Sequence, residues 1–164
     1  MIEDKTKIEF ANSADANEIA IISKNDIEYG LGWKYTPARI ARLIRDSSKN
    51  VVVARSDTLL LGFGIMTYGE TQANLDLLAV KRGFRRMKVA TQIVQWLEEV
   101  ALNAGLFNIF VQVRAGNQTA IKFYKHLGFF ELDRDRTYYR GVEAGVLMAK
   151  GLRGIFDFDC ELYK

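Results

Sequence analysis

The sequence is poor in the residues that build covalent cross-links and metal sites. Its 164 residues contain one cysteine, Cys160, one histidine and one proline, Pro37. A single cysteine cannot form a disulfide within its own chain, and histidine or thiolate ligands for zinc are nearly absent. These counts exclude an intrachain disulfide framework, predict no metal site, and favour a reducing, cytoplasmic environment.

Long apolar runs are also lacking, since none approaches the roughly 20 residues that cross a bilayer. The first ten residues, MIEDKTKIEF, are charged and contain no apolar stretch of the kind found in secretory signals. We therefore expect neither a signal peptide nor a membrane partner. The net charge of +3 is too small to indicate nucleic acid by itself. With 49% apolar and 26% charged residues, the chain has the composition of an ordinary globular domain.

Hydrophobic periodicity and turn signals predict eleven helices and strands in the order β-α-α-β-β-β-α-β-α-β-β. Strands are predicted at residues 7–10, 51–55, 59–68, 73–80, 106–113, 129–132 and 145–149. Helices are predicted to begin at Ser13, Thr36-Pro37, Lys88 and Asn117. Early hairpins and late crossovers predict an α/β (α+β) fold, with a mixed, mostly antiparallel sheet of about six to seven strands flanked by helices.

The C-terminal segment differs from the rest of the chain. Residues 154–164 alternate apolar and acidic side chains and fit no part of the predicted core. We expect a single domain over residues 1–150, followed at residues 151–164 by a tail or an extra strand. A dimer arm is a further interpretation of this segment, so a homodimer stays open.

Residues 80–90, VKRGFRRMKVA, join a predicted strand to a predicted helix. Five lysines and arginines fall within residues 81–88. A strand that leads through a turn into a helix N-terminus presents several backbone N–H groups to an anion, which makes it suitable for a phosphate. The plain alternative is a solvated basic loop before an ordinary helix. The density of positive charge favours the phosphate interpretation.

A second strand–turn–helix block, VQVRAGNQTAIKFYKHLGFF, follows at residues 111–130. Asn117 is a suitable N-cap for its helix. Ala120 and Tyr124 are four residues apart and therefore share one helix face. Taken alone, Tyr124 reads as a core aromatic residue. Together with Asn117, Gly128 and the basic turn upstream, it becomes a candidate functional group.

The two blocks together resemble the acyl-CoA-binding core of the GNAT N-acetyltransferases. The later segments are most similar in pattern to the ribosomal-protein-alanine acetyltransferase group, with which the chain shares Arg114, Asn117, Tyr124, Tyr138-Tyr139 and Met148. The resemblance implies the GNAT fold, acetyl-CoA as co-substrate, and transfer of its acetyl group to a primary amine. The acceptor it implies is a small molecule or a peptide or protein N-terminus, attacking the thioester directly.

The resemblance also assigns roles to residues of this sequence. The residues it implies for cofactor binding are Leu78, Ala79, Val80, Arg85, Arg86, Met87, Lys88, Val89, Ala90, Asn117, Ala120 and Tyr124. In addition, Tyr124 is implied as the general acid that protonates the departing thiolate, which a phenol with an ordinary pKa near ~10 can do at neutral pH. The backbone N–H of Leu78 is implied to polarise the thioester carbonyl.

Two positions depart from the family pattern. Lys88 stands where the phosphate turn usually has its middle glycine, which is unfavourable only if that position requires a positive φ or a very close approach of the backbone. Gln112 stands where the ribosomal-protein-alanine group has a glutamate base, and an amide cannot accept a proton at neutral pH. Asp76 is then the best candidate for the base, with a water chain as the alternative, although it could equally form a cross-strand pair.

Acceptor binding is the least specified part of the site. Trp33 and Tyr35, between the first two predicted helices, and Gln112 are the weak candidates. The two aromatic residues could bind an apolar or cationic acceptor, or simply pack the corner between the helices. Other functions are a CoA-binding protein with little catalysis, suggested by Lys88 and Gln112, and an aminoacyl-tRNA acetyltransferase, suggested by the pI of ≈ 9.0. Nucleic acid is disfavoured because the phosphates of CoA already account for the basic turn.

Overall fold

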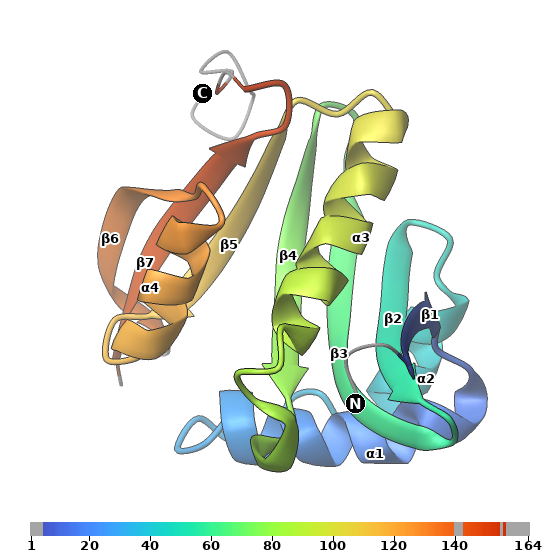
Figure 1. Cartoon of the computed structure of the whole chain (residues 1–164). Helices are drawn as coiled ribbons and strands as arrows, with labels where there is room; N and C mark the ends of the chain where they lie inside the picture. The colour runs from blue at the N-terminus through green and yellow to red at the C-terminus, as the bar shows by residue number, and fades with distance from the viewer. Residues whose placement is uncertain (1–4, 140–142, 155, 157–164) are drawn as a thin grey trace. The chain divides into compact units, whose positions relative to one another are not determined.

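The computed structural model describes residues 5–139, 143–154 and 156 and contains the predicted elements in the predicted order (Figure 1). The strands are β1 Thr6–Phe10, β2 Lys49–Ser56, β3 Leu59–Tyr68, β4 Gln72–Val80, β5 Asn108–Arg114, β6 Phe130–Tyr139 and β7 Glu143–Gly151. The helices are α1 Ala16–Ile22, α2 Pro37–Arg45, α3 Val89–Asn103 and α4 Gln118–His126. The last two strands are several residues longer than the sequence predicts. None of the helices in these described parts is long and apolar enough to cross a membrane.

The chain divides into two compact units, residues 1–67 with 76–97, and residues 68–75 with 98–164. Strand β4 belongs to both, so the first unit has the strand order β1-β2-β3-β4 and the second β4-β5-β7-β6. Strands β4 and β5 pair in parallel, while the pairs β1–β2, β2–β3, β5–β7 and β6–β7 are antiparallel. The mixed, mostly antiparallel seven-stranded sheet is therefore confirmed.

Local sequence explains where the first two helices begin. The Thr36 hydroxyl accepts a hydrogen bond from the Arg39 N–H at 3.4 Å, and Pro37 follows at the first helical position, as predicted. At α1 the prediction of Ser13 as N-cap is wrong. A 3-10 turn, Ser13–Asp15, leads into α1, and Asn12 caps this turn. The Asn12 side chain accepts from the Ala14 N–H while its own N–H donates to Asp15, each at 2.9 Å, and Asp15 is the N-cap residue of α1 itself.

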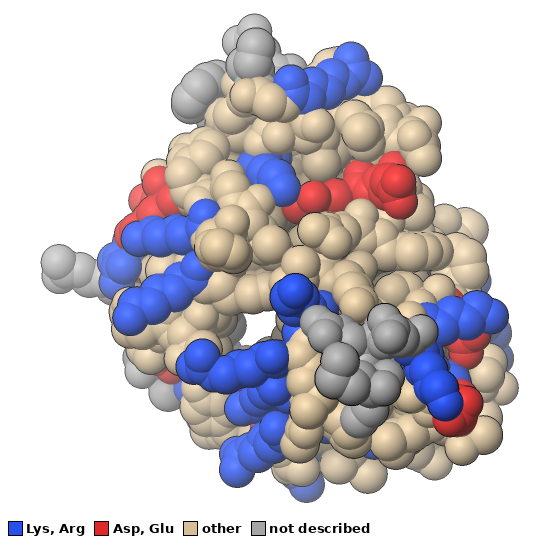
Figure 2. All heavy atoms as spheres, viewed as in Figure 1, with Lys and Arg blue, Asp and Glu red and all other residues tan. Residues whose placement is uncertain are grey.

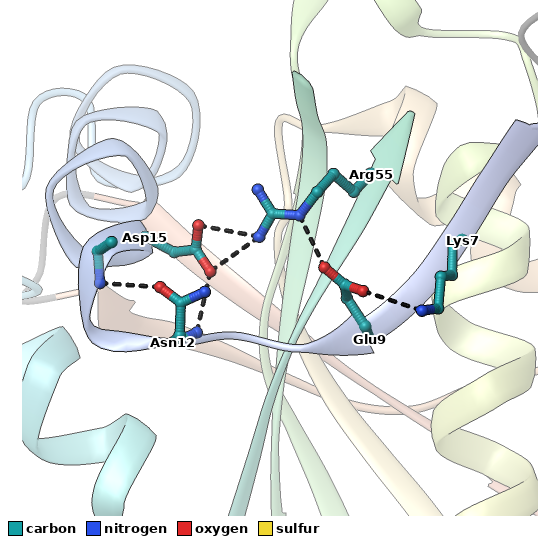
Figure 3. A network of polar contacts seen from close by, with 6 residues as sticks. Lys7, Glu9, Asn12, Asp15 and Arg55 are labelled. Carbon is teal, nitrogen blue, oxygen red and sulfur yellow. Dashed lines mark hydrogen bonds and ion pairs between the residues drawn. The ribbon is translucent and has the colours of Figure 1, made fainter. Parts of the chain in front are cut away.

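The same Asp15 belongs to an ion network that ties the start of α1 to the sheet (Figure 3). The Arg55 guanidinium donates to both carboxylate oxygens of Asp15 at 2.9 Å and to Glu9 at 2.8 Å. Only 9% of the Asp15 side chain is exposed, so its charge needs this partner. The hydrogen bond from Arg55 also lowers the pKa of Glu9. The network fixes β1, β2 and the entry to α1 as one piece.

Two glycines of β3 let other parts of the first unit come unusually close to that strand. A Cβ at Gly64 would lie 2.7 Å from the Ile93 side chain and 3.1 Å from that of Leu97, both on α3. A Cβ at Gly62 would lie 2.7 Å from the Ala79 carbonyl oxygen of β4. Neither position leaves room for a side chain, so α3 lies against a part of β3 that is backbone alone.

The second unit has its own small core. Phe110 of β5 and Ala149 of β7 are buried and pack with Leu132, Leu147 and Phe156. The ring of Phe156 contacts that of Phe110, with 5.8 Å between the ring centroids. Thus at least one residue beyond β7 packs on the strands. The rest of the predicted tail, residues 157–164, lies outside the described residues, and the division at residue 150 stays a prediction.

Candidate active site

The turn between β4 and α3 has two residues in the left-handed region that are not glycine. The φ angles are 62° at Arg86 and 59° at Lys88. The Lys88 carbonyl accepts the hydrogen bond of the Gln92 N–H at 3.0 Å, so helical hydrogen bonding begins there. The N–H groups of the first three helical residues, Val89 to Thr91, consequently have no acceptor within the helix.

The departure at Lys88 therefore falls on a position that does require a positive φ. For a residue with a Cβ, this conformation costs about 1–2 kcal/mol, and the turn contains it twice. Left-handed residues inserted in such a turn rotate successive N–H groups toward a common side, which produces an anion-binding concavity. Local strain of this kind is typical of a functional site.

The basic side chains of the turn have partners within the first unit. Arg85 donates from Nε to the Val80 carbonyl at 3.2 Å, and its Nη2 lies 3.4 Å from Asp26 Oδ1. Arg82 reaches the same Asp26 oxygen at 3.7 Å. Lys81 forms an ion pair with Glu18. Figure 2 shows Lys and Arg side chains gathered where Figure 1 draws this turn. The Val80 carbonyl, predicted to face the cofactor, is thus held by Arg85 here.

Asp76, the candidate base, lies on β4 among polar groups of the first unit. Its carboxylate accepts a hydrogen bond from the Thr67 hydroxyl and lies 3.8 Å from Lys49 Nζ. Burial raises the pKa of Asp76, and the Thr67 hydrogen bond and the charges of Lys49 and Arg39 oppose that rise. A carboxylate whose pKa is raised in this way is a better proton acceptor than an ordinary aspartate.

The two candidate acceptor-binding aromatics behave differently. Trp33 is 39% exposed and lines a cavity of ≈ 750 Å³ in the first unit. Its indole N–H donates to the Ala20 carbonyl at 3.2 Å, and Lys24 Nζ lies 4.8 Å from its ring centroid. Tyr35 packs against the core beneath α1 and α2 and does not line the cavity. Only Trp33 is therefore placed to meet a ligand in this cavity.

The candidate residues of the second unit lie on the β5–α4 block. Asn117 caps α4 as predicted, because its side-chain oxygen accepts from the Ala120 N–H at 3.1 Å. Tyr124 is 5% exposed and packs edge-on against Phe123 and Phe129, with centroid distances of 5.1 and 5.3 Å. The helix ends at Gly128, whose φ of 94° only glycine adopts without strain.

One ion pair that shapes this block escapes sequence inspection. Arg114, at the end of β5, donates to Glu143 of β7 at 2.6 Å, and the other Glu143 oxygen accepts from the Gly116 N–H at 2.8 Å. The Arg114 hydrogen bond and that of Gly116 lower the pKa of Glu143. A Cβ at Gly116 would lie 2.6 Å from the same carboxylate. Arg114 was identified from the sequence, but nothing in the spacing points to Glu143.

Gln112 is the remaining candidate in the second unit. The β4–β5 ladder ends at the pair Leu75–Val111, and Gln112 is the next residue on β5. Its side-chain oxygen is buried and is the one such atom, among side chains of the described residues, that lacks a hydrogen-bond partner. The same part of the chain contains no cluster of three or more His, Cys, Asp or Glu side chains able to hold a metal.

The structure thus assigns the candidates to separate units. Asp76, Trp33 and the predicted cofactor residues from Leu78 to Ala90 lie in the first unit. Asn117, Ala120, Tyr124 and Gln112 lie in the second. The first group lies on β4, on the β4–α3 turn, at the start of α3 and, for Trp33, between α1 and α2, and the second lies on the β5–α4 block.

The sequence comparison names the class of protein to which these two strand–turn–helix blocks belong. Residues 16–129 match the sequence profile of the acetyltransferase (GNAT) family, and the chain belongs to that family. Its enzyme class is therefore the one that the motifs predict, an N-acetyltransferase that uses acetyl-CoA. The cation-rich turn, with its left-handed residues and the N–H groups at the start of α3, fits the phosphates of that co-substrate.

Particular relatives agree with this family. Over 97 residues the chain is 30% identical to the [ribosomal protein bS18]-alanine N-acetyltransferase of Salmonella typhimurium, a match that covers 57% of this chain and 66% of that protein. The ribosomal-protein-S18-alanine N-acetyltransferase of Escherichia coli has a similar structure, with a TM-score of 0.78, 21% identity and coverage of 97% and 99% of the two chains. The structure of the PaiA N-acetyltransferase of Thermoplasma acidophilum, solved with coenzyme A, is also similar. Its TM-score is 0.76 and its sequence identity 20%, and the match covers 89% of this chain and 98% of that chain.

Proposed function

We propose that this chain transfers the acetyl group of acetyl-CoA to the α-amino group of a peptide or protein N-terminus. The observation that carries the choice of acceptor is the 30% identity to an enzyme named for the alanine of a ribosomal protein. The similar structure of a second enzyme with that name supports it. We do not extend the proposal to that ribosomal protein itself, because Gln112 replaces the base of that group.

We assign the donor side of the reaction to the β4–α3 turn. Acetyl-CoA supplies an activated acetyl thioester and a chain of phosphates. The N–H groups at the start of α3 and the cations Arg85, Arg86 and Lys88 would hold those phosphates, supported by the left-handed backbone at residues 86 and 88. Leu78, Ala79 and Val80 would align the thioester along the end of β4, and the Leu78 N–H would polarise its carbonyl.

Tyr124 is assigned as the general acid. As the amine nitrogen bonds to the carbonyl carbon, the C–S bond breaks, and the departing sulfur needs a proton. The Tyr124 phenol holds a proton at neutral pH and can donate it. Its burial between Phe123 and Phe129 supports this role, since the ring has little freedom to turn away. Asn117 and Ala120 would flank the cofactor on the same helix.

Asp76 is assigned as the group that takes the proton from the amine, directly or through water. The burial that raises its pKa favours proton uptake. Lys49 and Thr67 hold the carboxylate in place, which a base requires. Gln112 cannot take this part, but its buried oxygen can accept a hydrogen bond from an N–H of the acceptor.

The test is the release of free CoA thiol from acetyl-CoA in the presence of matched acceptors. Three acceptors separate the acceptor classes. They are a hexapeptide with a free N-terminus, the same peptide with a blocked N-terminus and one internal lysine, and the polyamine spermidine. We expect turnover with the free N-terminus alone. Turnover with spermidine only would show that the acceptor is a small amine and not a peptide N-terminus. Binding of acetyl-CoA with no turnover on any acceptor would support a CoA-binding protein instead.

Two further properties remain predictions. The cytoplasmic location and a homodimer are suggested by the sequence alone. Sedimentation of the full chain, with and without CoA, would decide whether it dimerises.

A further inference from the structure

The cavity beside α1 is lined by two carboxylates that the assignments above do not use, Asp26 and Glu28. Asp26 lies on a π-helix, Ser23–Ile27, that continues α1. Segments of π-helix are rare and are frequent at functional sites. The Asp26 side chain is 12% exposed, and it lines the ≈ 750 Å³ cavity together with Trp33, Tyr29 and Arg82. The other acidic residue of the lining, Glu28, accepts hydrogen bonds from Ser23, Lys34 and Tyr35.

The partners of Asp26 are the arginines of the cofactor turn. Arg82 and Arg85 reach the same oxygen of Asp26, at 3.7 and 3.4 Å. Arg82 is 81% exposed and Arg85 50%, so each pair is worth only about 0–1 kcal/mol. Both contacts are longer than the roughly 2.7–2.9 Å of a charge-assisted hydrogen bond, whereas a phosphate group can bind each arginine through such bonds, often in a bidentate manner. The phosphates of acetyl-CoA can therefore take both arginines from Asp26.

We propose that Asp26 binds a positively charged group of the acceptor in this cavity, and that Arg82 and Arg85 release it for this role only when acetyl-CoA is bound. Before cofactor binding, the guanidinium groups of Arg82 and Arg85 neutralise Asp26. The lining then has three cations, Lys24, Lys81 and Arg82, against the two carboxylates of Asp26 and Glu28, which disfavours a further cation. Once phosphates hold the arginines, a nearly buried carboxylate remains in the cavity. A carboxylate suits an ammonium or guanidinium group through charge-assisted hydrogen bonds.

The release of Asp26 by Arg82 and Arg85 can be tested by the binding of acetyl-CoA alone. The matched variants are Asp26→Asn and Glu18→Gln, since each removes one negative charge near the turn but only the first removes a partner of the arginines. Calorimetric titration with acetyl-CoA should show roughly two- to fivefold tighter binding for Asp26→Asn than for Glu18→Gln, because the phosphates no longer compete. Equal affinities of the two variants for acetyl-CoA would overturn the proposed competition between Asp26 and the phosphates.

The recognition step rests on the proposed function for its ligand, so its test uses binding and not turnover. The probes are two hexapeptide amides that differ only by lysine or norleucine at the second position, titrated into the full chain with and without CoA. We expect the lysine peptide to bind at least tenfold more tightly with CoA present, and this preference to disappear in Asp26→Asn but not in Glu18→Gln. A preference that is independent of CoA, or that survives in Asp26→Asn, would overturn the proposal. Loss of turnover with this binding intact would count against the proposed function alone.

Discussion

The β4–α3 and β5–α4 blocks have the same topology, a strand that leads through a turn into a helix, but they treat their backbone donors in opposite ways. Lys88, at the start of α3, has no side-chain acceptor with which to cap the helix. Asn117 caps α4, and Glu143 takes the Gly116 N–H in the turn before it. The residue at the start of α3 thus accepts no N–H of that helix with its side chain, whereas side-chain oxygens of the second block accept from the N–H groups of Ala120 and Gly116. A side-chain cap uses an N–H group that could otherwise bind an anion at the helix N-terminus.

We expect the largest effect from a change in the second block that removes one functional group and leaves the structure intact. Tyr124→Phe removes only the hydroxyl, and we expect kcat to fall roughly 100-fold or more, the ordinary contribution of a general acid. The Kd for acetyl-CoA and the midpoint of urea unfolding should hardly change. A parallel loss of turnover and of cofactor affinity would instead assign Tyr124 to packing.

The next effect asks whether the first block contributes chemistry as well as binding. Asp76→Asn should lower kcat/KM by roughly 10–100-fold and remove the decline of activity toward acid pH. Because burial raises the folded-state pKa of Asp76, its ionised form destabilises the fold. That cost is absent below the unfolded-state pKa and fully present above the folded-state pKa.

The asparagine variant should consequently be at least as stable as the parent protein at pH 7 and lose its advantage as the pH falls toward 4. Urea titrations at pH 7 and pH 4 measure this. A variant that is less stable at pH 7 would show that the contacts with Thr67 and Lys49 outweigh the cost of burial.

The third change tests the glycine that ends the second block. Gly128→Ala places a Cβ on a residue with φ of 94°. The nearest atom, Cε of Lys150, would be 3.4 Å away and can move, so the cost is conformational and about 1–2 kcal/mol of unfolding free energy. Urea denaturation measures the loss, and no change would mean that the chain there adopts another conformation.

We expect the smallest effect from the opposite kind of substitution in the first block, which introduces a glycine at a residue with a positive φ. Lys88→Gly and Lys88→Ala both remove the charge, but only glycine accepts the φ of 59° without strain. We expect the glycine variant to be about 1 kcal/mol more stable than the alanine variant. Both should bind acetyl-CoA more weakly than the parent protein if the lysine charge contributes, which calorimetry tests. An alanine variant as stable as the glycine variant would contradict the left-handed conformation.

Sequence patterns were sufficient for the elements, the family and the helix caps at Thr36 and Asn117, since these depend on residues within a few positions of one another. They were insufficient for features that depend on distant partners. Ser13 looked like a cap, but Asn12 forms the box with Asp15, whose charge Arg55 balances. Glu143 and Asp26 carried no local signal, because the arginines that identify them lie 29 residues away for Glu143 and 56 and 59 residues away for Asp26.

Lys88 combines one feature that the sequence shows, the residue type, with one that it does not show, the φ angle. The sequence identified the unusual residue, but not the φ angle on which its meaning depends. Likewise, Trp33 and Tyr35 were equivalent in the sequence, and only their packing separates the residue that lines the cavity from the one that joins the core.

The two glycines of β3 restrict how this family member can change over evolutionary time. Gly64 lets Ile93 and Leu97 lie against bare backbone, and the same helix, α3, begins with N–H groups that have no acceptor within the helix. A single added methyl group in the middle of that strand would have to be accommodated by a shift of α3, and with it of those donors. Substitution at residue 64 is thus limited by where α3 places its first N–H groups, which that residue does not contact.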